Sequence, residues 1–418
     1  MSFCIENKLH WLYIDINSYF ATIEQQVNPD LRNKPVAVVP MLSDSTCAIA
    51  ASYEAKVKGI NTGTKIYVAK KLCPELVCIK AKHDLYVEYH HKIFNEVDRY
   101  LHVDHIFSID EGACRLTGKY CLEEEAVAMA RIIKRAIRNN VGDYITSSIG
   151  IASNRYLAKI ASNIQKPDGL SVINPSELPD KLYSLKLKSL PGIGTKTEAR
   201  LIKNGISSVK QLCYLDRARL RALWGNVWGE KVWYLIRGAD LPLEETKKST
   251  IGHSKVLGPE EQEAHYARNI LIYLTQKTAN RLRDKALFTT GILLTVNFNS
   301  GKVINESNKI KLSNDTSALL KQILKSWDKI LGKVDNRTIK VKKIGISFYN
   351  LQSESNQLSF DDLHKQRKNQ KISGVIDSIN KKMGINTVSI GINTKTYKSE
   401  QIVAFGHIPN TGNKEAHR

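Results

Sequence analysis

Three acidic residues in two short segments have the types and spacing that could hold metal ions. Asp15 ends an apolar run, where a carboxylate is costly unless it is paired or metal-bound. Asp110 and Glu111 are adjacent, so both can face one site only where a strand ends in a turn, and Gly112 permits that bend. Each segment alone has an ordinary alternative, which is a helix-capping aspartate for the first and a solvated acidic turn for the second.

Together the three carboxylates indicate phosphoryl transfer, provided that their strands are neighbours in one sheet. Mg²⁺ prefers few protein carboxylates, several waters and substrate phosphates. Two such ions roughly 4 Å apart stabilise both the attacking and the leaving oxygen of an in-line displacement. The candidate chemistry is therefore metal-dependent transfer to or from a phosphate.

The elements that must position these residues follow from hydrophobic periodicity. The pattern predicts four strands and a long helix, namely strands at 9–16, 105–109, 113–116 and 144–151 and a helix at 123–138. Asn17 or Ser18 is expected to cap a helix after the first strand. This order predicts a ferredoxin-like α+β sheet, interrupted by an insertion at residues 30–80.

The second half of the chain has a different organisation. Residues 186–245 are predicted to form short helices with glycine breaks, and 246–249 a linker. Mixed α and β structure is expected at 250–350, with helices near 260–286 and 315–331 and strands at 289–298 and 338–349. Residues 351–370 are expected to be loose, and a last helix and strand to lie within 371–392.

The chain is strongly basic. Its 418 residues include 62 Lys and Arg against 41 Asp and Glu, a net charge of +21. Residues 251–418 contain 27 basic and 14 acidic residues, so they carry +13 of this excess. Such a charge attracts phosphate polymers, although a basic protein without a polyanionic partner is an even alternative on composition alone.

Cysteine usage and the N-terminus indicate a cytoplasmic protein. The seven cysteines have no zinc-type spacing and an odd count, which suits a reducing compartment, and Cys114 and Cys213 are expected in the core. We expect no signal peptide and no membrane span, because no apolar run approaches about 20 residues.

Five segments resemble, in family order, the motifs of the Y-family DNA polymerases, which copy damaged templates with low fidelity. They are 15–24, 51–56 with Gly59, 108–111, 153–162 with 166–169, and 190–194. The resemblance covers about 1–350 and has features of both the UmuC and the DinB branches. It implies a right-hand polymerase, with a ferredoxin-like palm, small fingers, a helix-hairpin-helix thumb and a mixed α/β little finger.

The resemblance also implies roles for single residues. Asp15, Asp110 and Glu111 would be catalytic and, with the Ile16 carbonyl, would bind two Mg²⁺ ions, for which Mn²⁺ can substitute. The nucleotide would be met by Tyr19, Phe20, Tyr53, Lys56 and Lys166, and DNA by the glycine turn at Gly192 and Gly194. Phe20 would be the gate that excludes a ribose 2′-OH; without the motif it would read as a core aromatic.

Some positions depart from the family pattern. Position 17 is Asn where many members have Asp, and position 56 is Lys where Arg is common. Lysine keeps the charge but loses the planar fork of arginine. Gln357, Leu358 and Phe360 resemble a sliding-clamp peptide that lacks one apolar residue, with an incidental polar linker as an even alternative.

The domain limits implied are palm at 1–29 and 81–185, fingers at 30–80, thumb at 186–245, little finger at 250–350 and a tail at 351–418. The implied function is template-directed addition of deoxynucleotides to a primer, in damage tolerance of the SOS type and without proofreading. Implied partners are primer-template DNA, dNTP, a sliding clamp and a UmuD-like accessory protein. A nucleotide cyclase and a catalytically silent DNA-binding scaffold are the rival functions.

Overall fold

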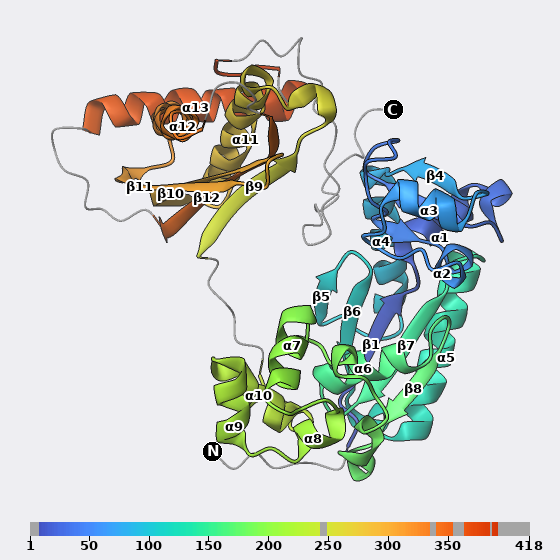
Figure 1. Ribbon diagram of the computed structural model, residues 1–418. Coiled ribbons are helices and arrows are strands. Elements are labelled where there is room, and N and C mark those ends of the chain that lie inside the picture. The colour runs from blue at the N-terminus through green and yellow to red at the C-terminus, as the bar shows by residue number, and fades with distance from the viewer. Residues whose placement is uncertain (1–7, 243–248, 335–339, 354–362, 385–386, 392–418) are drawn as a thin grey trace. The chain divides into compact units, whose positions relative to one another are not determined.

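The computed structural model describes residues 8–242, 249–334, 340–353, 363–384 and 387–391 (Figure 1). The described residues fall into two compact units, one containing 8–242 and the other the residues from 249 onward. The predicted linker at 246–249 lies almost entirely outside the described residues, and so does the clamp-like peptide at 357–360.

A five-stranded sheet forms the centre of the first unit, in the order β5-β6-β1-β7-β8. Its strands are β5 (His105–Ser108), β6 (Glu111–Arg115), β1 (Trp11–Ile16), β7 (Ser147–Ala152) and β8 (Leu170–Ile173). The central strand β1 is antiparallel to both neighbours, and β8 is parallel to β7. The ferredoxin-like order is confirmed, although β8 was not predicted and β7 begins three residues later than expected.

The two faces of β1 serve different purposes because side chains alternate along a strand. Leu12, Ile14 and Ile16 are buried in a core with three helices. These helices are α1 (Tyr19–Val27), α4 (His83–Asp98) and α5 (Glu123–Asn140). The opposite face carries Trp11, Tyr13 and Asp15, and α6 (Arg155–Ile164) packs against this side.

Near the acidic residues, one local prediction is wrong and another is confirmed only in position. Gly112 does not make the bend, which falls at Ile109 and Asp110. A Cβ atom on Gly112 would lie 2.5 Å from the Phe94 ring, so close packing requires the glycine. Ser18 occupies the cap position of α1 in a left-handed conformation, with φ of 47°, and its side chain makes no capping hydrogen bond.

Within the stretch predicted as an insertion at 30–80, the residues form a small body with its own core. Three short strands, β3 (Ala50–Ala51), β2 (Val36–Val39) and β4 (Val77–Lys80), pair in that order. Helices α2 (Tyr53–Val57) and α3 (Ile66–Leu72) accompany them. Strands of two to four residues give too little periodicity to be predicted individually.

Short helices complete the first unit, as expected from the glycine breaks. They are α7 (Thr195–Lys203), α8 (Val209–Cys213), α9 (Arg217–Trp224) and α10 (Val227–Leu235). Their buried residues share a core with α6 and the Trp11 face of the sheet. Asn154 at the start of α6 donates hydrogen bonds to the Leu235 and Ala239 carbonyls, which ties the two parts together.

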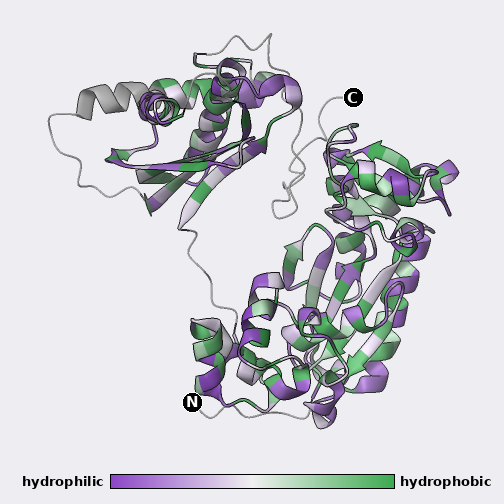
Figure 2. Cartoon of the chain, viewed as in Figure 1, coloured by the Kyte–Doolittle hydropathy of each residue, from purple (hydrophilic) through white to green (hydrophobic). Residues whose placement is uncertain are grey.

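The second unit is a four-stranded antiparallel sheet in the order β11-β10-β12-β9, covered by helices. Its elements are β9 (Thr250–Val256), α11 (Ala264–Asp284), β10 (Leu287–Phe298), β11 (Val303–Ser313), α12 (Thr316–Leu331), β12 (Val341–Ser353) and α13 (Leu363–Met383). Apolar and polar residues alternate along these strands (Figure 2). The predicted mixed α/β structure is confirmed, whereas β9 and β11 were missed.

The prediction that residues 351–370 are loose is wrong in part. Strand β12 continues to Ser353, and α13 begins at Leu363. Farther along α13, Asp377 forms an ion pair of 2.5 Å with Arg283 of α11, and Ser373 donates to Asp315. Side-chain contacts therefore fasten α13 to the rest of the second unit.

Cys114 and Cys213 are buried as predicted, and all six cysteines in the described residues are free. No helix in the described ranges has the length and apolar character needed to cross a membrane.

Candidate active site

The three predicted carboxylates come from adjoining strands at one end of the sheet. Asp15 pairs in register with Glu111 across β1 and β6, and the backbone N–H of Ile16 donates to the Asp110 carbonyl over 2.9 Å. Asp15 is 7% exposed. Burial raises the pKa of both Asp15 and Asp110, and the neighbouring Lys166 opposes the shift at Asp15. The structure therefore brings the three acids together at a site that is largely shielded from solvent.

The three acids have different partners. Asp110 accepts a hydrogen bond of 2.5 Å from the Ser108 hydroxyl. Glu111 accepts from Lys159 at 2.8 and 2.7 Å and from the Tyr13 hydroxyl at 2.9 Å. Burial pushes the pKa of Glu111 upward, but the hydrogen bonds and charge of Lys159 outweigh it and leave the pKa lowered.

Lys166 lies next to Asp15, on a segment that side-chain contacts hold in place. Its Nζ lies 2.7 Å from Asp15 Oδ2. Two residues on, Asp168 has a φ of 57° and forms an ion pair with Lys134 of α5. Lys134 also donates to the Ser147 carbonyl, so the segment carrying Lys166 is fastened to both α5 and β7.

Tyr53 and Lys56 on α2 lie near the same carboxylates. Lys56 Nζ donates to the Ser18 hydroxyl over 2.7 Å and lies 4.4 Å from the centre of the Tyr53 ring. Burial lowers the pKa of Lys56, and the positive charge of Lys166 adds to this effect. Burial and the charge of Asp15 raise the pKa of Tyr53 to about 12. Two segments that are far apart in sequence therefore place cations beside Asp15.

Tyr19 and Phe20 are buried at the start of α1. Phe20 is 2% exposed, and its ring stacks on Tyr86 with centroids 4.3 Å apart and an interplanar angle of 16°. Tyr86 is fixed in turn, because its hydroxyl donates to the buried Glu24 and its carbonyl accepts from Tyr19. Phe20 thus has a rigid flat surface behind it.

The glycines at 192 and 194 lie at the beginning of α7, distant in sequence from the carboxylates. Gly192 has a φ of +87°, and a Cβ there would lie 2.9 Å from Nε1 of Trp228. Gly194 is the residue before α7, and no atom lies within 4 Å of the place for its Cβ. This turn exposes backbone ahead of a helix N-terminus, where N–H groups are available to an anion.

The donor chemistry at the site fits Mg²⁺. Among the described residues, no group of three or more His, Cys, Asp or Glu side chains is arranged so that it could hold a metal ion by itself, and this includes the three acids here. Mg²⁺ does not need one, because one or two carboxylates together with waters and substrate phosphates commonly complete its octahedron. Buried Asp15 and Asp110 supply such oxygens.

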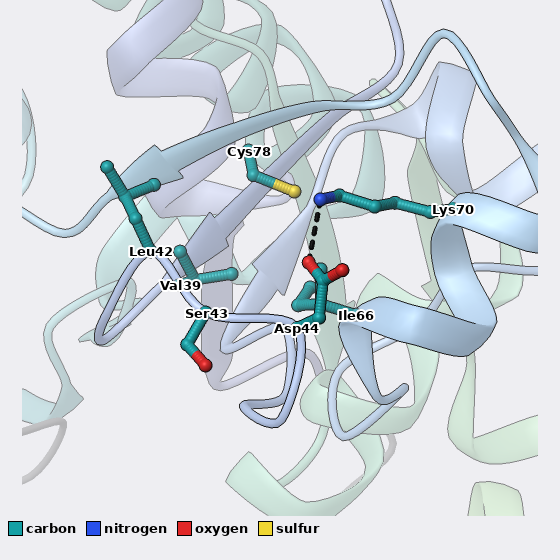
Figure 3. A pocket seen from close by; sticks show the side chains of 7 residues that line it. All are labelled: Val39, Leu42, Ser43, Asp44, Ile66, Lys70 and Cys78. Carbon is teal, nitrogen blue, oxygen red and sulfur yellow. Dashed lines mark hydrogen bonds and ion pairs between the residues drawn. The ribbon is translucent and has the colours of Figure 1, made fainter. Parts of the chain in front are cut away.

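A separate hollow of about 120 Å³ lies in the inserted body and contains none of the predicted site residues (Figure 3). Lys70 and Asp44 form an ion pair of 2.6 Å beside it, and Cys78 contributes to its lining. Figure 3 shows these three side chains converging from different elements.

Several residues that shape the site were not identified from the sequence. Lys159 and Tyr13 hold Glu111, Lys134 holds the Lys166 segment, and Tyr86 backs Phe20. A signal existed for Lys159, because it follows Arg155 by four residues and these two are the only charged residues of α6. Contacts between Tyr13 and Glu111 leave no such trace, because they depend on strand pairing.

A ferredoxin-like sheet with acids at the end of its central strand, an inserted small body, a set of short helices and a second basic α/β unit together define the class of right-hand polymerases. Three family models match the chain. The impB/mucB/samB family matches residues 14–163, its C-terminal domain 248–360, and the thumb domain of DNA polymerase iota 188–240.

Relatives and solved structures agree with this class. DNA polymerase IV of Moorella thermoacetica is 36% identical over 279 residues, 65% of this chain and 69% of the relative. DNA polymerase IV of Treponema denticola is 27% identical over 380 residues, 90% of this chain and 94% of the relative.

Among solved structures, a chimeric Y-family DNA polymerase aligns with a TM-score of 0.70 and 24% identity over 82% of this chain and all of the other. DinB from Sulfolobus solfataricus aligns with a TM-score of 0.53 and 25% identity over the same shares. The chain belongs to the Y family of DNA polymerases, and it is a DNA-directed DNA polymerase.

Proposed function

We propose that this polymerase copies damaged templates with low fidelity, using two Mg²⁺ ions held by Asp15, Asp110 and Glu111. The observation that carries the proposal is the meeting of Asp15 and Asp110 at the end of the sheet, beside Lys166 and Lys56. Carboxylates and cations there suit a site that must accept both metal ions and a triphosphate. The family's dependence on metal supports the need for the ions, and their identity is our inference.

When bound, the two ions would activate the primer 3′-OH and stabilise the leaving pyrophosphate. Asp15 and Asp110 would help to hold both ions. The Ile16 carbonyl would add a ligand to the ion on the nucleotide side, and Glu111 would add one to the ion at the primer end. Mn²⁺ would substitute, since it accepts the same oxygen ligands. Burial of the aspartates would strengthen their electrostatic attraction to the ions.

The remaining residues would bind and orient the nucleotide. Lys56, Tyr53 and Lys166 would contact the triphosphate, with the lysines acting as point charges rather than as planar forks. Tyr19 and Phe20 would lie beneath the sugar. The Tyr86 ring behind Phe20 would keep the phenyl group from yielding to a ribose 2′-OH. Discrimination of the sugar would therefore be steric.

We assign the palm to 1–29 and 81–185, the fingers to 30–80, the thumb to 186–245 and the little finger to 250–350. The thumb model at 188–240 supports the third limit. Backbone N–H groups near Gly192 and Gly194 would bind a DNA phosphate without regard to sequence. One solved relative is an insertion ternary complex of Dbh polymerase, which supports primer-template DNA and dNTP as the substrates here.

The open face of the sheet in the second unit would also meet the DNA backbone. A groove on it is lined by Gly252, His253, Ser254, Thr295, Asn297, Val303, Asn305, Lys343, Gly345, Ile346 and Ser347. Hydroxyl, amide and ammonium donors of this kind bind phosphates and fix register. Helices α11 and α12 pack on this sheet through its apolar side chains, which leaves its polar face for the duplex.

We further propose a cytoplasmic role in SOS-type damage tolerance, with a sliding clamp and a UmuD-like protein as accessory partners. The clamp would take Gln357, Leu358 and Phe360. The resemblance of the sequence to UmuC-type chains is the support for these partners.

The test is primer extension with Mg²⁺ on undamaged and abasic templates, with a no-template reaction alongside. We expect template-dependent extension, insertion opposite the abasic site and no cyclic nucleotide. Cyclic nucleotide formed without template would establish the cyclase instead, and tight DNA binding without extension would establish the silent scaffold.

A further inference from the structure

Two lysines from one stretch of chain each make an ion pair with an acid of the site. Lys159 on α6 lies 2.8 and 2.7 Å from the two carboxylate oxygens of Glu111. Lys166, just past the end of α6, lies 2.7 Å from Asp15 Oδ2. Both lysine side chains are less than one third exposed, at 31% and 28%. Each therefore places a positive charge directly on an acid of the site.

Tyr13 adds a second hold on Glu111. Its hydroxyl donates to Glu111 Oε2 over 2.9 Å and lies 3.3 Å from Lys159 Nζ. The Tyr13 ring stacks on Phe107, with centroids 5.5 Å apart and an interplanar angle of 20°. Ala113 pairs with both Tyr13 and His105, and its small side chain leaves room for the Tyr13 and His105 rings on either side. Glu111 is thus held at both oxygens by partners that are themselves fixed.

Asp110 differs from the other two acids. Its partner is the neutral hydroxyl of Ser108, and within the described part of the chain it forms no ion pair. The site without substrate thus has two acids neutralised by lysines and one acid that is buried and held by a hydroxyl.

We propose that Lys159 and Lys166 neutralise Glu111 and Asp15 in place of the metal cations while no substrate is bound. Substrate phosphates would then have to attract the two lysines away before the metal ions can bind Glu111 and Asp15. This inference rests on the proposed function, since it takes these acids as metal ligands. A cation is repelled from a carboxylate that already holds an ammonium group 2.7 Å away. Lysine sits on a flexible stem, so it can move to a stronger anion without distorting the backbone.

The geometry also assigns a substrate group to each lysine. Lys166 lies beside Lys56 and Asp15 and would move to the triphosphate. Lys159 is paired with Glu111 and would move to the phosphate at the primer end. Metal binding and substrate binding then favour each other by the same factor, because such coupling is reciprocal. Metal ions would therefore bind more tightly where both substrates are present.

The inference predicts that the lysine substitutions change metal affinity and catalysis in opposite directions. Removing either lysine should weaken polymerisation but tighten metal binding to the free enzyme. A lysine that only binds phosphate, or only stabilises the fold, would leave the metal affinity of the free enzyme unchanged or lower it.

The experiment is Mn²⁺ titration of the full chain without DNA or nucleotide, followed by the electron paramagnetic resonance signal of unbound Mn²⁺. Lys159→Gln and Lys166→Gln should each tighten Mn²⁺ binding by on the order of tenfold, an estimate discounted for solvent screening. Lys255→Gln is the matched control, because Lys255 pairs with Glu261 at 2.6 Å and the two side chains are 19% and 22% exposed. It should leave Mn²⁺ affinity unchanged.

Tyr13→Phe tests the same idea without removing a charge, and it serves if Lys159→Gln proves unstable. Loss of one hydrogen bond to Glu111 should tighten Mn²⁺ binding by about threefold to fivefold. Adding Glu111→Gln to Tyr13→Phe or Lys159→Gln, or Asp15→Asn to Lys166→Gln, should abolish the corresponding gain.

Unchanged or weaker Mn²⁺ binding in both lysine variants and in Tyr13→Phe would overturn the inference. The proposed function would survive that result if the single substitution Asp110→Asn, in a chain with both lysines and Tyr13 intact, still abolished primer extension. If Asp110→Asn extended primers normally, the metal-site assignment and this inference would fall together.

Discussion

The side-chain oxygen of Asn17 accepts a hydrogen bond of 2.7 Å from the backbone N–H of Asp168. This bond joins the turn after β1 to the segment that carries Lys166. The Asn17 amide also donates to the Ser148 hydroxyl over 2.9 Å, and Asn17 is 1% exposed. The residue that departs from the common family pattern therefore fastens together two parts proposed to meet the triphosphate.

Asn17→Ala should raise the KM for dNTP by about tenfold, because it leaves the Asp168 N–H without its partner and loosens the Lys166 segment. Asn17→Asp keeps the accepting oxygen, so the KM should rise much less. Steady-state kinetics of single-nucleotide insertion would measure both variants. Equal effects of the two substitutions would show that the hydrogen bond does not position Lys166.

Phe20→Ala should lower the preference for dCTP over rCTP by about 100-fold, since space opens next to the 2′-carbon. The substitution also leaves a cavity in front of Tyr86, which costs about 3–5 kcal/mol of stability. Phe20→Leu fills more of that cavity and should show a smaller change in sugar preference. Unchanged discrimination in a folded Phe20→Ala variant would reduce Phe20 to a core residue.

Replacing Leu358 and Phe360 by Ala should leave distributive extension intact and remove stimulation by a sliding clamp. Apolar anchors contribute most of the affinity of short docking peptides. The comparison is primer extension with and without the clamp for the wild-type and the doubly substituted chain. Full stimulation of the variant would place the docking site elsewhere.

DNA affinity should depend steeply on salt through the second unit. Residues 251–418 hold 27 basic and 14 acidic residues. If roughly four to six lysines engage phosphates, the slope of log affinity against log salt should be near −4 to −5. A chain truncated after Lys248 retains the cores of the first unit and should show weaker binding and a shallower slope. Equal slopes in fluorescence-anisotropy titrations would mean that the basic excess is a solvated surface.

Much of the scaffold could be predicted because burial imposes clear periods on the sequence. The apolar run before Asp15 and the spacing of 123–138 predicted β1 and α5, and their order predicted the sheet. Strand β11 was missed because its inward side includes Glu306 and Asn308 among its apolar residues, which weakens the alternation. Short strands such as β3, with two residues, leave almost no pattern.

The contacts within the site were harder to predict than its acids. A carboxylate at a strand end is visible in the sequence, but the lysine that pairs with it depends on which helix packs on that face. Lys159 reaches Glu111 because α6 lies over the Tyr13 side of the sheet. Likewise, Gly112 was predicted to allow a bend, whereas the structure shows that the Phe94 ring leaves no space for a side chain there. Contact with a ring from α4 cannot be predicted from the local sequence.

The most direct test of the central claim is primer extension by the Asp110→Asn chain, beside the wild type and an EDTA control. Removing a charge that both ions are proposed to share should cost several kcal/mol in the transition state. Extension should therefore fall by about three orders of magnitude, because each 1.36 kcal/mol is tenfold in rate. Affinity for primer-template DNA should stay near that of the wild type. Extension at a near-normal rate by a folded Asp110→Asn chain would contradict the account.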